Sequence, residues 1–106
     1  MIKPNVLFKV QKQFLVDTLK DIDNQLLYIN STNPLEFKHL SRSFFVLFQS
    51  YIECSSNPWG SDTPQFAFYV SLSDQLKIHQ INFLRDPESS FNFLKIIQNL
   101  QTELQS

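Results

Sequence analysis

The chain has 106 residues, of which 42% are hydrophobic and 18% are charged. This length suits one domain with a single core, and the composition is typical of a globular protein rather than of a disordered segment. Nine Lys and Arg residues nearly balance ten Asp and Glu residues, so the formal net charge is only −1. We therefore expect one domain, residues 1–106, without a chain-wide attraction to nucleic acid or to an anionic membrane.

The first expected element is a helix that begins near Pro4, because proline is tolerated in the first turn of a helix. Apolar residues follow at helical spacing, including Leu7 and Val10. Residues 14–20 fit the helical pattern and the strand pattern about equally. The residues alone slightly favour a helix that continues toward Ile22.

A short strand and a well-marked helix start come next. Residues 25–30 are largely apolar and are followed by the turn formers of residues 31–33, which predicts a strand. Asn33 is a good helix N-cap, Pro34 suits the first helical position, and Glu36 stands where the acid of a capping box would be. This combination predicts the start of a long helix.

The long helix has one broad apolar stripe. Phe45 and Ile52 make this stripe wider than one contact surface requires. Their side chains either add to the buried core or face a second chain. The stripe residues recur every three or four positions: Phe37, Leu40, Phe44, Leu47, Phe48 and Tyr51.

Residues 55–64 form a loop with the only Gly and the only Trp of the chain, and we expect Trp59 to cover the edge of the core. Apolar residues alternate with other residues from Phe66 to Leu72, which predicts a strand. Ser73-Asp74 would turn the chain back into a second strand over residues 76–83. The apolar parity of that segment changes near its middle, which suggests a bulge.

A closing helix completes the predicted order. Ser89 or Ser90 can cap it, and its apolar residues again recur at helical spacing. These residues are Phe91, Leu94, Ile97, Leu100 and Leu104. The expected fold class is therefore α+β, with the order helix, an uncertain strand over residues 14–20, strand, helix, strand, strand, helix.

The residue types that carry chemistry are sparse. One glycine leaves no phosphate-binding loop, and His39, His79 and Cys54 lack the spacing of a zinc site. Cys54 follows an apolar helix, so we expect it to be buried as a small hydrophobic residue rather than to act as a nucleophile. A single cysteine also fits a reducing compartment. We predict no enzyme activity, no cofactor and no metal.

The predicted order of elements resembles the roadblock family of dynein-light-chain-like modules, and the resemblance covers nearly the whole chain. Residues 1–7 (Met-Ile-Lys-Pro-Asn-Val-Leu) look like the opening of a family member from the Ragulator complex, in which a basic residue and a proline precede the first helix. Residues 14–31 are similar to the first hairpin of the family, and residues 91–104 to its last helix. By this resemblance the first helix would stop near Gln13, and the fold would be a roadblock-like α/β sandwich with a long helix on an antiparallel sheet.

The resemblance implies a non-catalytic scaffold or adaptor in a Ragulator-like complex at the lysosomal or vacuolar membrane. Its implied partners are other roadblock subunits in a heterodimer, a lipid-anchored scaffold subunit and Rag-type GTPases in TORC1 nutrient signalling. The chain would then lie on the cytosolic face of lysosomal, vacuolar or late endosomal membranes and reach them only through a partner. A light chain of dynein or of another trafficking complex is the alternative.

Roadblock modules pair side by side through a sheet edge and the long helix, and an exposed strand edge needs such cover. The expected partner interface therefore combines the segment 66–72 with the long helix. Its residues are Phe45, Phe48, Phe66, Phe68 and Val70.

Overall fold

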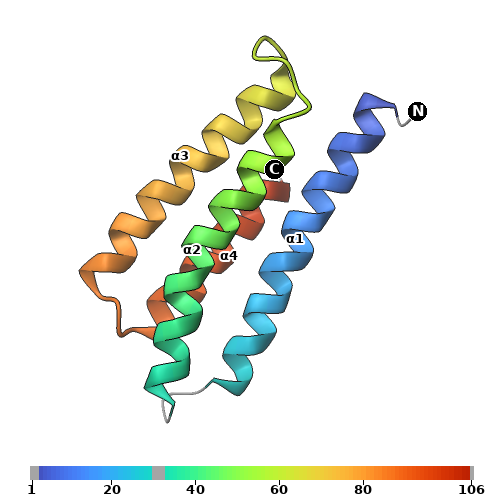
Figure 1. Cartoon of the computed structure of the whole chain (residues 1–106). Helices are drawn as coiled ribbons and strands as arrows, with labels where there is room; N and C mark the ends of the chain where they lie inside the picture. The colour runs from blue at the N-terminus through green and yellow to red at the C-terminus, as the bar shows by residue number, and fades with distance from the viewer. Residues whose placement is uncertain (1–2, 30–32, 106) are drawn as a thin grey trace.

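The computed structural model describes residues 3–29 and 33–105, and it shows a bundle of helices (Figure 1). Four helices follow one another along the described chain, and each runs antiparallel to the one before it. They are α1 (Pro4–Tyr28), α2 (Pro34–Ser56), α3 (Pro64–Arg85) and α4 (Ser90–Gln105).

Helices that are consecutive in the chain pack side by side, and α4 closes the bundle by packing against α1. The bundle is elongated, with extents of 48 × 24 × 21 Å. Helix α4 has 16 residues against 25 in α1, so α1, α2 and α3 extend beyond the C-terminal end of α4.

The predicted α+β fold class is therefore wrong. No strand occurs in residues 3–29 or 33–105, so neither the sheet nor the α/β sandwich of the roadblock resemblance is present in the described chain. The long helix that begins at Pro34 and the closing helix are confirmed.

Helix α1 overturns the predicted N-terminal hairpin. It runs unbroken from Pro4 to Tyr28, so the helix does not stop near Gln13 and residues 14–20 are not a strand. Residues 25–28 are helical as well, and Asn30, at the end of that predicted strand, lies outside the described residues. The physical reason is a core-facing stripe at helical spacing: Leu15 and Leu19 are buried, and Ile22 and Leu26 pack against the core.

Helix α3 replaces the second predicted hairpin. Residues 66–72, 73–74 and 76–83 all belong to one helix. Its core-facing residues recur at intervals of three and four, which a strand cannot bring to one face. They are Tyr69, Leu72, Leu76, His79 and Phe83. The helical spacing also explains why the apolar residues of segment 76–83 change from one parity to the other, which suggested a bulge.

Three of the helices have side-chain caps of the same kind. The Asn33 side chain accepts a hydrogen bond from the amide of Glu36 at 3.3 Å, and Pro34 follows at the first helical position. Thr63 caps α3 by accepting from the amide of Phe66 at 3.2 Å. Ser89 Oγ accepts from the amide of Asn92 at 3.1 Å at the start of α4. These caps satisfy amides that a helix start leaves unpaired.

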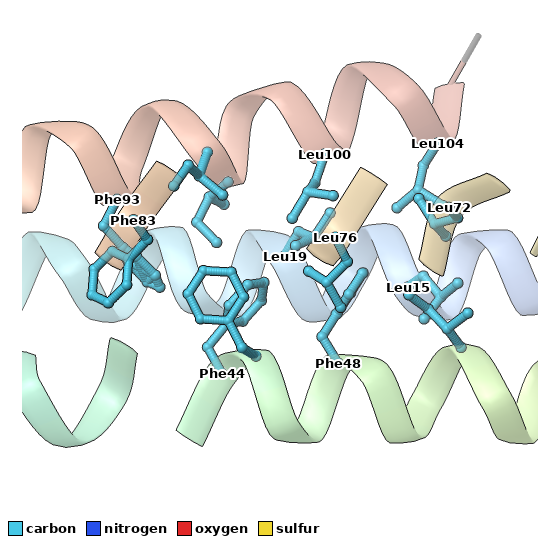
Figure 2. Packing of buried hydrophobic residues seen from close by; sticks show 14 of the residues in the cluster. Leu15, Leu19, Phe44, Phe48, Leu72, Leu76, Phe83, Phe93, Leu100 and Leu104 are labelled. Carbon is cyan, nitrogen blue, oxygen red and sulfur yellow. The ribbon is translucent and has the colours of Figure 1, made fainter. Parts of the chain in front are cut away.

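The core changes character along the bundle (Figure 2). One end, here called the aromatic end, is filled by rings from α2, α3 and α4 whose centroids lie 5.2 to 6.1 Å apart. Its residues are Phe37, Phe44, Phe45, Phe83 and Phe93. Toward the opposite end the core becomes aliphatic, with Leu15, Leu72 and Leu104 from three different helices (Figure 2).

At that opposite end, here called the polar end, Gln11 of α1 joins three parts of the chain. Its Oε1 accepts hydrogen bonds from Trp59 Nε1 at 2.9 Å and from the Tyr69 hydroxyl at 2.8 Å. Its Nε2 donates to the carbonyl of Ser55 at 3.0 Å. The ring of Phe8 makes edge contacts with Trp59 and Tyr69. Trp59 therefore covers the edge of the core, as the sequence predicted.

Candidate functional site: a groove between α2 and α3

The predicted interface residues do not gather on one exposed surface. Phe45 and Phe48 of α2 are buried in the core, so a partner that approaches the folded bundle does not reach them. Phe66 and Phe68 lie in α3, both half-buried, and Phe68 packs against Phe8. Val70 is exposed. The edge strand on which this interface was predicted is a helix.

The side chains with reactive chemistry are also dispersed. Cys54 is exposed, which corrects the expected burial, and His39 is exposed as well. His79 is buried in α3, with its Nε2 3.0 Å from Glu103 Oε1 of α4. Among the described residues, no three His, Cys, Asp or Glu side chains are placed to hold a metal ion.

A groove of about 730 Å³ lies between the start of α2 and the end of α3. It lies where these helices meet at the aromatic end, in the lower part of Figure 1. We call it the α2–α3 groove. Its lining residues are Pro34, Leu35, Phe37, Lys38, Ser41, Arg42, Phe83, Leu84, Pro87 and Glu88.

The groove is apolar at its floor and on both walls. Phe37 and Phe83, which belong to the buried core, reach its floor. Leu35 on one wall and Leu84 on the other are each 64% exposed. Two exposed leucines across an apolar floor form the kind of surface that a partner's apolar side chains can cover.

Two cations stand on the α2 side of this groove. Lys38 and Arg42 are one helical turn apart and both are exposed. Neither forms an ion pair with another residue in the described part of the chain. Like charges at this spacing repel each other by a few tenths of a kcal/mol. An anionic group bound between them would relieve that repulsion.

The local sequence fixes both walls. Asn33 and Pro34 set the first turn of α2, which places Leu35 and Lys38. Helix α3 ends at Arg85, because Pro87 cannot continue it, and the amide of Asp86 bonds back to the carbonyl of Phe83 at 3.0 Å. The groove is thus bounded by a capped helix start and a proline-ended helix.

A smaller hollow of about 410 Å³ lies between α3 and α4 near the C-terminal end of α4. Phe68, Ser71, Leu72, Gln75 and Glu103 line it. It has less apolar wall than the α2–α3 groove and contains one acidic side chain and no basic one. We therefore regard the α2–α3 groove as the candidate site.

Part of this groove is predictable from the sequence. The cap at Asn33-Pro34 predicts its α2 wall, whereas Leu84 belongs to none of the predicted elements. The sequence signal for the α3 wall is a leucine, Leu84, two residues before the Asp86-Pro87 pair at which the helix has to end.

Comparisons of the sequence with protein-family models, with curated proteins and with solved structures found no match. None of the helices in the described part of the chain is long and apolar enough to span a membrane. The groove is therefore interpreted from its own geometry and chemistry.

Proposed function

We propose that this protein is a non-catalytic binding module whose α2–α3 groove holds an amphipathic helix of a partner protein. The partner helix places apolar side chains between Leu35 and Leu84 and an acidic side chain against Lys38 and Arg42. The observation that carries the proposal is the pairing of an apolar groove with two cations that have no ion-pair partner among the described residues.

The shape of the site supports a helical occupant. An apolar groove between two helices is a common receptor for an amphipathic helix, whose anchors recur every three or four residues. Leu35 and Leu84 are exposed at 64% each, so covering them removes apolar area from water at about 25 cal/mol per Å². Lys38 and Arg42 add specificity for an acidic flank and raise the association rate more than they raise affinity.

The narrower expectation, a scaffold subunit that recruits Rag-type GTPases in a Ragulator-like complex, depended on a sheet that the described chain lacks. The dynein light-chain alternative depended on the same sheet. We retain only the broader part of that expectation, namely that the chain is a protein-binding subunit without catalytic activity. Purification of the tagged chain from its own cells, with mass spectrometry of the bound proteins, tests all three partner classes together.

The groove itself is tested with the purified partner and three variants of the chain. Leu84→Glu puts a charge into the groove and should weaken binding about 30-fold, as expected for loss of an apolar anchor. Arg42→Glu reverses one rim charge and should weaken binding about fivefold, with a smaller dependence on salt. The matched control is Ile81→Glu, because Ile81 is exposed on the same helix but does not line the groove.

Isothermal titration calorimetry supplies the affinities, and circular dichroism checks that each variant is folded. A partner that binds Leu84→Glu and Ile81→Glu equally well would overturn the assignment of the groove. A partner whose binding strengthens in Arg42→Glu would keep the groove but reverse the predicted charge of its occupant.

A further inference from the structure

A second apolar surface lies on α1, on a different face from the α2–α3 groove. Val6, Val10 and Phe14 are spaced four residues apart and are between 47% and 59% exposed. Tyr51 of α2 supports Phe14 through a ring contact at 5.3 Å, and Leu47, one turn before Tyr51, is half exposed beside it. We call these five residues the α1 face.

Charged residues continue the same stripe at both ends. At 100° per residue, Val6, Val10, Phe14 and Asp17 lie within about 40° of one line along the helix, and Lys3 is the N-cap residue just before its first turn. The stripe is therefore basic at its start, apolar in its middle and acidic at its end. Lys3 and Asp17 are each seven residues from Val10.

This arrangement is complementary to itself when two copies run antiparallel. A two-fold axis through Val10 places Lys3 of one copy opposite Asp17 of the other, and the same contact repeats on the far side of the axis. It also places Val6 opposite Phe14. A symmetric dimer needs such a self-complementary surface, because the same patch serves both subunits.

In this register Lys3 and Asp17 are the charged residues that face each other across the two copies. Lys9 and Lys12 lie about 100° or more from the centre line of the stripe, and the Lys12 Nζ lies over the rings of Phe8 and Phe68 instead. A parallel pairing would place Lys3 against Lys3 and Asp17 against Asp17, whereas the antiparallel pairing places Lys3 against Asp17. Asp17 already accepts a hydrogen bond from Gln13 Nε2 at 2.9 Å, which holds its carboxylate on this side of the helix.

We infer that the α1 face is a homodimer interface in which α1 pairs antiparallel with α1 of a second copy about a two-fold axis near Val10. Figure 1 shows α1 at the edge of the bundle, where a second copy can reach it. The inference uses no residue of the α2–α3 groove, so it stands or fails separately from the proposed function.

Light scattering after size-exclusion chromatography measures the mass directly, and the dimer should have twice the 12.5 kDa of one chain. Val10→Glu should give a folded monomer. Val46→Glu, at a more exposed position on the outer side of α2, should leave the dimer intact. A wild-type chain that is monomeric at 100 µM, or equal effects of both variants, would overturn the interface.

A charge swap tests the antiparallel register. Lys3→Asp alone and Asp17→Lys alone should each weaken the dimer about tenfold, because each creates two repulsive contacts in a symmetric dimer. The double variant Lys3→Asp with Asp17→Lys should recover the wild-type affinity. Additive weakening in the double variant would rule out this register.

Crosslinking locates the axis. In a Cys54→Ser background, V10C should form a disulfide between two copies when glutathione disulfide takes the two electrons and the protons, releasing two glutathione molecules. V46C in the same background should remain uncrosslinked. A covalent dimer from V46C but not from V10C would place the interface elsewhere.

Discussion

The aromatic end and the polar end of the bundle both contain packed rings, but the polar end adds a network of side-chain hydrogen bonds. At the aromatic end, Phe93 contacts the rings of four other phenylalanines and stability comes from filled volume. At the polar end, one amide side chain, Gln11, makes three hydrogen bonds to α2, α3 and the loop between them. Replacing a ring at the aromatic end lowers stability by leaving a cavity. Removing the Gln11 amide at the polar end lowers stability by leaving two donors without an acceptor.

The difference also explains where the candidate groove lies. Phe37 and Phe83 belong to the packed aromatic end and present part of their surface to the groove floor, so the floor is rigid and apolar. At the polar end the loop that carries Trp59 connects α2 with α3 (Figure 1), and the Trp59 ring lies against Phe8 of α1.

The largest effect is expected at the aromatic end. Phe93 is completely buried, so Phe93→Ala should lower the free energy of unfolding by about 3–5 kcal/mol through lost burial and a cavity among the rings. Phe91→Ala is the matched control, because Phe91 is the same residue type on the same helix and is largely exposed. Urea denaturation measures both. Similar losses for the two variants would contradict the assignment of the core face of α4.

At the polar end we expect a smaller loss. Gln11→Leu keeps the approximate size of the side chain but leaves the indole of Trp59 and the hydroxyl of Tyr69 without their acceptor, which should cost about 1–3 kcal/mol. Gln13→Leu changes the same residue type at an exposed site of α1 and should stay within about 0.5 kcal/mol of the wild type. Thermal or urea unfolding of the two variants gives the comparison. Equal stabilities would show that the network does not hold the polar end.

The smallest effect appears only at high pH. Burial raises the pKa of Tyr69 to about 12, from an ordinary value of 10.0, and the Ser55 hydroxyl opposes part of that rise. Since the folded state keeps this proton more tightly than the unfolded chain, the contribution is fully present below pH 10 and is lost as the pH rises toward 12. Tyr69→Phe should remove this alkaline loss, whereas Tyr28→Phe at an exposed site should not. Melting temperatures measured across that pH range decide the question.

The parts of the fold that the sequence predicted correctly are those with explicit boundary signals. Asn33-Pro34 with Glu36 predicts the start of α2, and Ser89 predicts the start of α4. Thr63-Pro64 gives the same kind of signal for α3, because the threonine caps the helix and the proline follows at its first position. The prediction places Thr63 and Pro64 in the loop of residues 55–64, and the start of α3 is therefore missed.

The remaining errors came from short windows. Over residues 66–72 nearly every side chain is apolar or small, so a period of two and a period of 3.6 fit equally well. Only the full stretch from Tyr69 to Phe83 separates them, through buried residues at intervals of three and four. Residues 14–20 had the same ambiguity, and the resemblance to a family with a hairpin there decided it in the wrong direction.

Of the candidate site, the sequence predicted the capped α2 wall. It could not predict the groove as a whole, because Leu84 joins Leu35 only when α3 is one helix that returns antiparallel to α2. A related limit applies to the predicted interface at Phe45 and Phe48: a wide apolar stripe does not show which of its residues face a partner, and the bundle places both of them in its core.

Helix α3 connects the two ends, since it carries Tyr69 of the polar end and Phe83 of the aromatic end, and it forms one wall of the groove. Its continuity through Ser73-Asp74 is therefore the central structural claim. Backbone chemical shifts from nuclear magnetic resonance measure it residue by residue. We predict helical Cα shifts without interruption from residue 64 to residue 85. Extended shifts at residues 66–72 and 76–83, with a turn at residues 73–74, would contradict the bundle and the groove together.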